Sequence, residues 1–194
     1  MRIVYGMLQI LEEPTVRERA MPVSVEGYHC MLQAGLVSEK AELIRGVIIE
    51  KMSKSPLHIY FTDLLAELAK SAIFSGQMVR QESPLTLADS EPAPDLAIVQ
   101  GQRADYLTSH PTTALLVIEI ATGSERLNRE MATIYAEAGV QEYWIILGQK
   151  RAVEIFRRPV NGVYQEQQIF QLGETIQSAI IPGWTLAVSD IFPA

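Results

Sequence analysis

The sequence has little cysteine, little histidine and no long hydrophobic run. A single cysteine, Cys30, among 194 residues excludes an internal disulfide and Cys-rich zinc sites, and it fits a reducing cytosol. The strongest apolar run, residues 114–118, is far shorter than the roughly 18 residues that span a bilayer. Basic residues are in deficit, 16 against 23 acids, so a DNA-binding role requires a local basic patch.

The N-terminus lacks the features of an export signal. Residues 1–11 form a short apolar stretch that Gln9 interrupts, and no small-residue cleavage site follows. We therefore expect a cytoplasmic protein that does not contact membranes. The hydrophobic content of 48% is that of a well-cored soluble chain. We expect an N-terminal extension over residues 1–21 and one domain over residues 22–194.

Helical and extended periodicities alternate along the chain. Helices are expected over residues 24–34, 56–75 and 125–138, with a hairpin over 41–52 and strands near 77–87, 95–99, 114–121, 142–147, 152–157, 163–170 and 184–187. A turn is expected over 159–162, and a helical turn ends the chain. The core face of the second helix is expected to contain Leu57, Tyr60, Phe61, Leu64, Leu65 and Leu68. This order predicts an α/β fold, a mixed β-sheet flanked by helices with additional β-hairpins.

Glu119 is the most informative residue because it interrupts an apolar run suited to a buried central strand. An ionised carboxylate taken out of water costs several kcal/mol unless it is paired or binds a metal. Glu119 is therefore a candidate functional residue. A carboxylate that emerges at a strand end, or one paired with an arginine, is an equal alternative.

Asp95 opens another predicted strand, after the two prolines of EPAP. If strands 95–99 and 114–121 are neighbours, Asp95 and Glu119 can face one cleft. Two carboxylates close together suit Mg²⁺ or Mn²⁺, with water and a substrate phosphate as the remaining ligands. By itself, an aspartate in this context is more often a turn-capping residue.

Several segments resemble one known family. AELIRGVIIEKM, SPLHIYFTDLL, QESPLTLADSEPAPDLAIV, LLVIEIATGS and NREMATIYAEAGVQEYWII resemble the Uma-two family, whose members are described as bacterial endonucleases. That family belongs to the restriction-endonuclease-like PD-(D/E)XK superfamily, and the resemblance covers about residues 22–192. It implies a restriction-endonuclease-like fold and Mg²⁺- or Mn²⁺-dependent hydrolysis of DNA. Our first hypothesis is a homodimeric endonuclease of this kind.

The resemblance also implies roles for individual residues. Asp95, after Pro94, matches the PD motif, and Asp95 and Glu119 would be the metal ligands. Glu42 would assist metal or water binding. His58 would contact metal, water or phosphate, and a helix-capping or half-buried histidine is an equal alternative.

A lysine is absent where the superfamily has one. Ile120 and Ala121 follow Glu119 where the superfamily has E-x-K, and the lysine that Uma-two proteins show on the next helix is absent near Met131. Arg126 or Arg129 could supply the charge, but a guanidinium differs in geometry and keeps its proton. Loss of one charge-stabilising group typically costs a few orders of magnitude in rate.

This departure leaves three hypotheses open. The first is the active endonuclease, and the second is a catalytically impaired member of the fold that binds DNA or another protein. The third is a metal-dependent phosphodiesterase with a substrate other than duplex DNA. Cations that could form a local basic patch, or simply discourage edge pairing as solvated residues, are Lys51, Lys54, Lys150, Arg151, Arg157 and Arg158.

Overall fold

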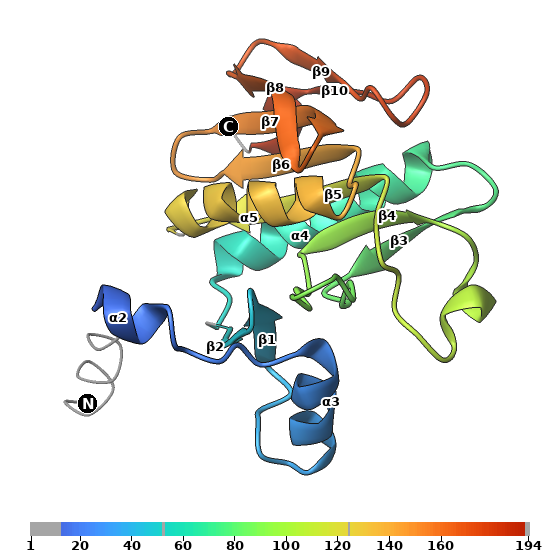
Figure 1. The fold of residues 1–194 in the computed structure, drawn as a ribbon. Helices are drawn as coiled ribbons and strands as arrows, with labels where there is room; N and C mark the ends of the chain where they lie inside the picture. The colour runs from blue at the N-terminus through green and yellow to red at the C-terminus, as the bar shows by residue number, and fades with distance from the viewer. Residues whose placement is uncertain (1–12, 52, 124, 193–194) are drawn as a thin grey trace.

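The computed structural model describes residues 13–51, 53–123 and 125–192 (Figure 1). Most of the predicted N-terminal extension, residues 1–12, lies outside the described residues. Its remainder contains the short helix α2 (Pro14–Arg17). Within the described residues, no helix is both long enough and apolar enough to cross a bilayer.

The centre of the fold is a mixed sheet of six strands in the order β3-β4-β5-β6-β7-β8. Strands β5 and β6 are parallel and are connected by helix α5 (Glu125–Glu137), whereas all other neighbours are antiparallel. The strands are β3 (Gln77–Gln81), β4 (Leu96–Gln100), β5 (Leu116–Ala121), β6 (Glu142–Leu147), β7 (Ala152–Val160) and β8 (Val163–Phe170). The structure therefore confirms the predicted mixed sheet with flanking helices.

Helices cover both faces of this sheet. On one face, Phe61 of α4 (Pro56–Ala72) packs in a cluster with Ile118 of β5. On the other face, Tyr135 of α5 packs in a second cluster with Val117. Because successive strand residues point to opposite faces, Glu119 lies on the α5 side of the sheet.

Smaller elements complete the fold. These are helix α3 (Val25–Gln33), the hairpin β1 (Ala41–Ile44) and β2 (Val47–Glu50), the 3₁₀ turn η2 (Arg103–Tyr106), the hairpin β9 (Thr175–Gln177) and β10 (Thr185–Ala187), and helix α6 (Val188–Ile191). Arg45 and Gly46 both have positive φ, 52° and 74°, which matches the tight turn predicted between β1 and β2. The sequence did not predict β9, since its three residues are too few to show a periodicity.

Two strand boundaries and one helix face differ from the prediction. Strand β3 ends at Gln81 instead of near residue 87, because Glu82 has a φ of 48° and Pro84 follows. Strand β7 extends to Val160, so the predicted turn over 159–162 is confined to Asn161 and Gly162, which both have positive φ. In α4, Leu57 and Tyr60 are exposed, 42% and 44%, rather than buried in the predicted core face.

Candidate active site

A cavity of about 360 Å³ lies where the N-terminus of α4 and the ends of the central strands meet the β1–β2 hairpin. Its lining includes all four candidate site residues, Glu42, His58, Asp95 and Glu119. These residues come from β1, from α4, from the residue before β4 and from β5. The fold thus brings together side chains that are up to 77 positions apart in the sequence.

Asp95 is buried and held from several directions. Its Oδ1 accepts a hydrogen bond from Nε2 of His58 at 2.8 Å, and its Oδ2 accepts one from the backbone N–H of Ile120 at 2.8 Å. The ammonium of Lys54 lies 3.2 Å from Oδ1. Burial alone would raise the pKa of Asp95, but the hydrogen bonds and charge of His58, with Ile120 and Lys54, hold this pKa below its usual value. Asp95 is therefore an oriented, ionised carboxylate.

Glu119 lies beside Asp95 because β4 and β5 pair in register. Its Oε2 is 3.4 Å from the backbone N–H of Asp95, and its Oε1 accepts a hydrogen bond of 2.8 Å from the hydroxyl of Tyr135. Burial, followed by the negative charges of Asp95 and Glu42, raises the pKa of Glu119 well above its usual value. The charge of this carboxylate is therefore only partly compensated by its neighbours.

Glu42 connects the β1–β2 hairpin to the segment that carries Asp95. Its Oε1 accepts a hydrogen bond from the backbone N–H of Ala93 at 2.6 Å and lies 3.0 Å from the ammonium of Lys51. Lys51 also donates to the backbone carbonyl of Ala93. Although burial opposes it, the carboxylates of Glu42, Glu119 and Asp95 raise the pKa of Lys51, so this lysine stays charged. Glu42 thus positions both Lys51 and the entry to β4.

Lys51 and Lys54 line the cavity, although the sequence offered them only as candidates for a local basic patch and not as catalytic residues. Lys51 and Lys54 belong to the short segment between β2 and α4. The suggested arginines of α5 do not take this position: Arg129 forms bonds of 2.9 and 2.7 Å with Glu154, and Arg126 is exposed. Little in the sequence indicates that Lys51 and Lys54 point into the cavity, because an irregular segment has no periodicity that shows the direction of its side chains.

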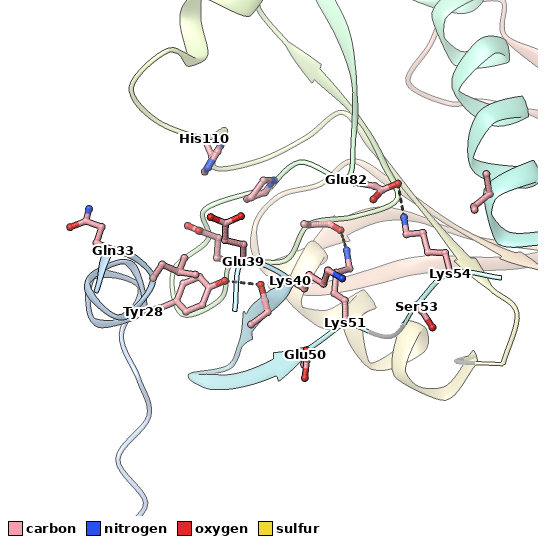
Figure 2. A pocket seen from close by; sticks show the side chains of 16 residues that line it. Tyr28, Gln33, Glu39, Lys40, Glu50, Lys51, Ser53, Lys54, Glu82 and His110 are labelled. Carbon is pink, nitrogen blue, oxygen red and sulfur yellow. Dashed lines mark hydrogen bonds and ion pairs between the residues drawn. The ribbon is translucent and has the colours of Figure 1, made fainter. Parts of the chain in front are cut away.

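A larger groove of about 1080 Å³ adjoins the cavity (Figure 2). Figure 2 shows Tyr28 and Gln33 on α3 on one side, His110 above, and Lys54 extending toward Glu82, to which it is bonded at 2.7 Å. Residues that line both hollows are Glu50, Lys51, Ser53 and Lys54. The segment after β2 therefore separates the groove from the carboxylates.

Comparisons with known proteins identify the family and the fold. A family profile described as "Putative restriction endonuclease" (Uma2) matches residues 25–189. The chain belongs to this family. A crystal structure of "a putative nuclease belonging to DUF820" from Anabaena variabilis has the same fold, with a TM-score of 0.72, 17% identity and coverage of 88% of this chain and 98% of that one. No curated protein matches the sequence significantly.

The donor set of this Uma2 chain fits a hard divalent cation. Within the described parts of the chain, no group of three or more His, Cys, Asp or Glu side chains is placed to hold a metal ion. Mg²⁺, however, commonly binds through one or two carboxylates and fills its other positions with water and phosphate. Asp95 and Glu119 supply such a pair, and a cation there would offset the mutual repulsion that raises the pKa of Glu119.

The cations of the β6–β7 hairpin do not form an unpaired basic patch. Lys150 bonds Glu125 at 2.5 Å, Arg157 bonds the buried Glu142 at 2.6 Å, and Arg158 bonds Glu166 at 2.8 Å. These pairs favour the alternative interpretation of the sequence, in which the cations are solvated surface residues that discourage pairing at the strand edges. The lysines beside the cavity, Lys51 and Lys54, are the ones that face a candidate site of the Uma2 fold.

We expect Glu119→Gln to raise the melting temperature of the metal-free protein at neutral pH. The raised pKa means that ionised Glu119 lowers stability progressively as pH rises above the ordinary glutamate pKa. The amide removes that charge and can still accept from Tyr135. Each kcal/mol gained corresponds to about 2–4 °C for a chain of this size. Thermal melts in EDTA between pH 4.5 and 8 measure the effect.

The difference between wild type and Glu119→Gln should shrink as pH falls toward 4.5, where the wild-type carboxyl becomes protonated. Added Mn²⁺ should then reverse the order at pH 7.5, because a ligand that binds only the folded wild type raises its stability. A variant that melts below wild type at pH 7.5 in EDTA contradicts the inferred repulsion.

Proposed function

We propose that the chain is a metal-dependent nuclease that hydrolyses phosphodiester bonds of DNA, with Mg²⁺ or Mn²⁺ held by Asp95 and Glu119. The observation that carries this proposal is the pairing of these two carboxylates, Asp95 buried and Glu119 half-buried, in one cavity, where Oε2 of Glu119 lies 3.4 Å from the amide nitrogen of Asp95. Structural acids are normally compensated by an arginine or lysine, whereas the charge of Lys51 only partly offsets the acids beside Glu119, which are Asp95 and Glu42. Membership of the Uma2 family supports the same reaction class.

The chain's own residues orient the reacting groups. His58 and the N–H of Ile120 direct the two oxygens of Asp95, and Tyr135 directs one oxygen of Glu119. A divalent ion bound there would lower the pKa of a water molecule and offset the charge that develops on the phosphate. His58 therefore acts through Asp95 in this proposal, as a positioning residue that limits how the carboxylate can rotate.

DNA is the proposed substrate because the cavity opens beside a groove that can accept the flanking chain. The groove is of mixed charge: Lys40, Lys51 and Lys54 line it together with Glu39, Glu50, Glu82 and Glu91. An electrostatic track along many phosphates is therefore not its source of affinity. We propose that one phosphate is held at the cavity itself, and that a homodimer presents two such cavities to a duplex.

The test is a cleavage assay with supercoiled plasmid, purified wild type and Glu119→Gln. Wild type should nick or linearise the plasmid with Mg²⁺ or Mn²⁺ and not with EDTA, and Glu119→Gln should be slower by at least about a hundredfold. Equal cleavage by both proteins would refute the assignment. A mobility shift of DNA without cleavage would favour the binding module, and cleavage of a small diester alone would favour the phosphodiesterase.

A further inference from the structure

A lysine that follows β2 lines the cavity and can supply a positive charge for catalysis. The inference drawn from it rests on the proposed nuclease function. We propose that Lys51, at the end of β2, is the catalytic residue whose ammonium binds and stabilises the phosphate undergoing hydrolysis. The residues after Glu119 on β5 are Ile120 and Ala121, so that strand offers no such group. The charge then comes from the hairpin that faces the carboxylates.

The position of Lys51 is the first support. Among described residues, the lysines and arginines that line the cavity are Lys51 and Lys54, and both follow β2. The Lys51 ammonium lies 3.0 Å from Glu42, and it interacts electrostatically with Glu119 and Asp95. A phosphate bound at the carboxylate pair would therefore lie next to this charge.

The remaining capacity for hydrogen bonding is the second support. A lysine ammonium has three N–H donors. Glu42 and the carbonyl of Ala93 take two from Lys51, and they hold the side chain in one direction. The third donor can turn to a phosphate oxygen without breaking either contact. Because the anchors are in place before substrate arrives, little reorganisation is needed during the reaction.

Lys54 is less suited to this role. Its ammonium lies between two carboxylates, 2.7 Å from Glu82 and 3.2 Å from Asp95. The side chain of Lys51 is also more accessible, 31% exposed against 20% for Lys54. A substrate phosphate can therefore reach Lys51 directly, whereas Lys54 helps to hold Asp95 in position.

The step that Lys51 assists is the hydrolysis itself. The oxygen of a water molecule forms a bond to phosphorus, and the bond from phosphorus to the leaving sugar oxygen breaks. The water releases one proton to solvent, and the sugar oxygen takes up one proton, so the products are a phosphate monoester and a hydroxyl. Lys51 keeps its proton throughout and donates a hydrogen bond to a non-bridging oxygen as negative charge grows there.

The test compares Lys51→Met and Lys51→Arg, with Lys70→Met as the matched control. Lys70 lies on α4 and its ammonium bonds Gln81 at the surface. Lys51→Met should cleave plasmid DNA about 100- to 1000-fold more slowly, as when one charge-stabilising donor is removed. Lys51→Arg should recover at least about tenfold of that loss, because it keeps the charge. Lys70→Met should cleave like wild type.

Calorimetric titration with Mn²⁺ in the absence of DNA distinguishes a catalytic role of Lys51 from a role in holding the metal site together. Lys51→Met should bind Mn²⁺ as tightly as wild type or more tightly, because a nearby positive charge is gone. Loss of Mn²⁺ binding together with cleavage overturns the catalytic role, and so does cleavage by Lys51→Met within about twofold of wild type. If Lys51→Met does not fold, Lys51→Arg decides, since its cleavage must then be no more than about a hundredfold slower than that of Lys70→Met. A wild type that cleaves nothing refutes the nuclease proposal, and this inference with it.

Discussion

Asp95→Asn should abolish metal-dependent DNA cleavage, with a rate loss of about a thousandfold or more. The carboxylate is the most highly organised group of the cavity, with contacts to His58, Lys54 and the N–H of Ile120. Asparagine has the same size but lacks the negative charge, and its NH₂ group would face one of these donors. The variant therefore loses a metal ligand and the orientation of the remaining oxygen together.

A matched control exists on the surface. Asp89 is an exposed aspartate that pairs with Arg45 at 3.0 Å and does not line the cavity. Asp89→Asn should cleave plasmid DNA at the wild-type rate, and both variants should be compared at saturating Mn²⁺. Cleavage by Asp95→Asn within about tenfold of Asp89→Asn would refute the role of Asp95 as a metal ligand.

The proximity of Asp95 and Glu119 follows from strand pairing, and the sequence analysis made it conditional on the strands 95–99 and 114–121 being neighbours. Strands β4 and β5 do pair, and the observed register joins Leu96 with Ile118. That register places the residue before Leu96 next to the residue after Ile118. The pairing of two strands therefore determines how close the two carboxylates lie. The start of α4 is also set locally, because the side chain of Ser55 accepts a hydrogen bond from the N–H of His58.

The position of the lysines could not be predicted in the same way. The segment after β2 approaches the carboxylates because the β1–β2 hairpin docks on the chain before β4, through the Leu43–Glu91 bridge and the bond from Ala93 to Glu42. These are tertiary contacts between segments about fifty positions apart, and no periodicity in either segment encodes them. The cations that the sequence suggested for this role, Arg126 and Arg129, belong to α5, whereas the lysines that line the cavity follow β2.

Burial of an acid on a strand was also a less specific signal than the sequence suggested. Glu142 and Glu154 occupy apolar strand sequences like that of Glu119, and they are 0% and 1% exposed. Both are bonded to arginines: Glu142 to Arg157 and Glu154 to Arg129. What distinguishes Glu119 is its partners: a tyrosine hydroxyl bonds it, the carboxylates of Asp95 and Glu42 lie near it, and the charge of Lys51 offsets these acids only in part. The partner, rather than burial, separates a candidate ligand from a structural acid.

The different partners of Glu119 and Glu142 predict that two substitutions, Arg157→Met and Glu119→Gln, change stability in opposite directions. Arg157→Met removes the guanidinium whose Nε lies 2.6 Å from Glu142, and leaves a fully buried carboxylate with Ser178 as its remaining close partner. Breaking a buried pair in this way costs about 3–5 kcal/mol. At about 2–4 °C per kcal/mol, the melting temperature should fall by roughly 6–20 °C. Glu119→Gln, in contrast, should raise it.

The double variant Arg157→Met/Glu142→Gln identifies the cause of that loss. If the uncompensated charge of Glu142 is responsible, replacing it with an amide should restore most of the melting temperature, because a neutral group is far cheaper to bury. The amide can still bond the hydroxyl of Ser178, which now lies 2.7 Å from the carboxylate. A double variant no more stable than Arg157→Met would instead assign the loss to the packing of the arginine side chain, and the contrast between Glu119 and Glu142 would then not be electrostatic.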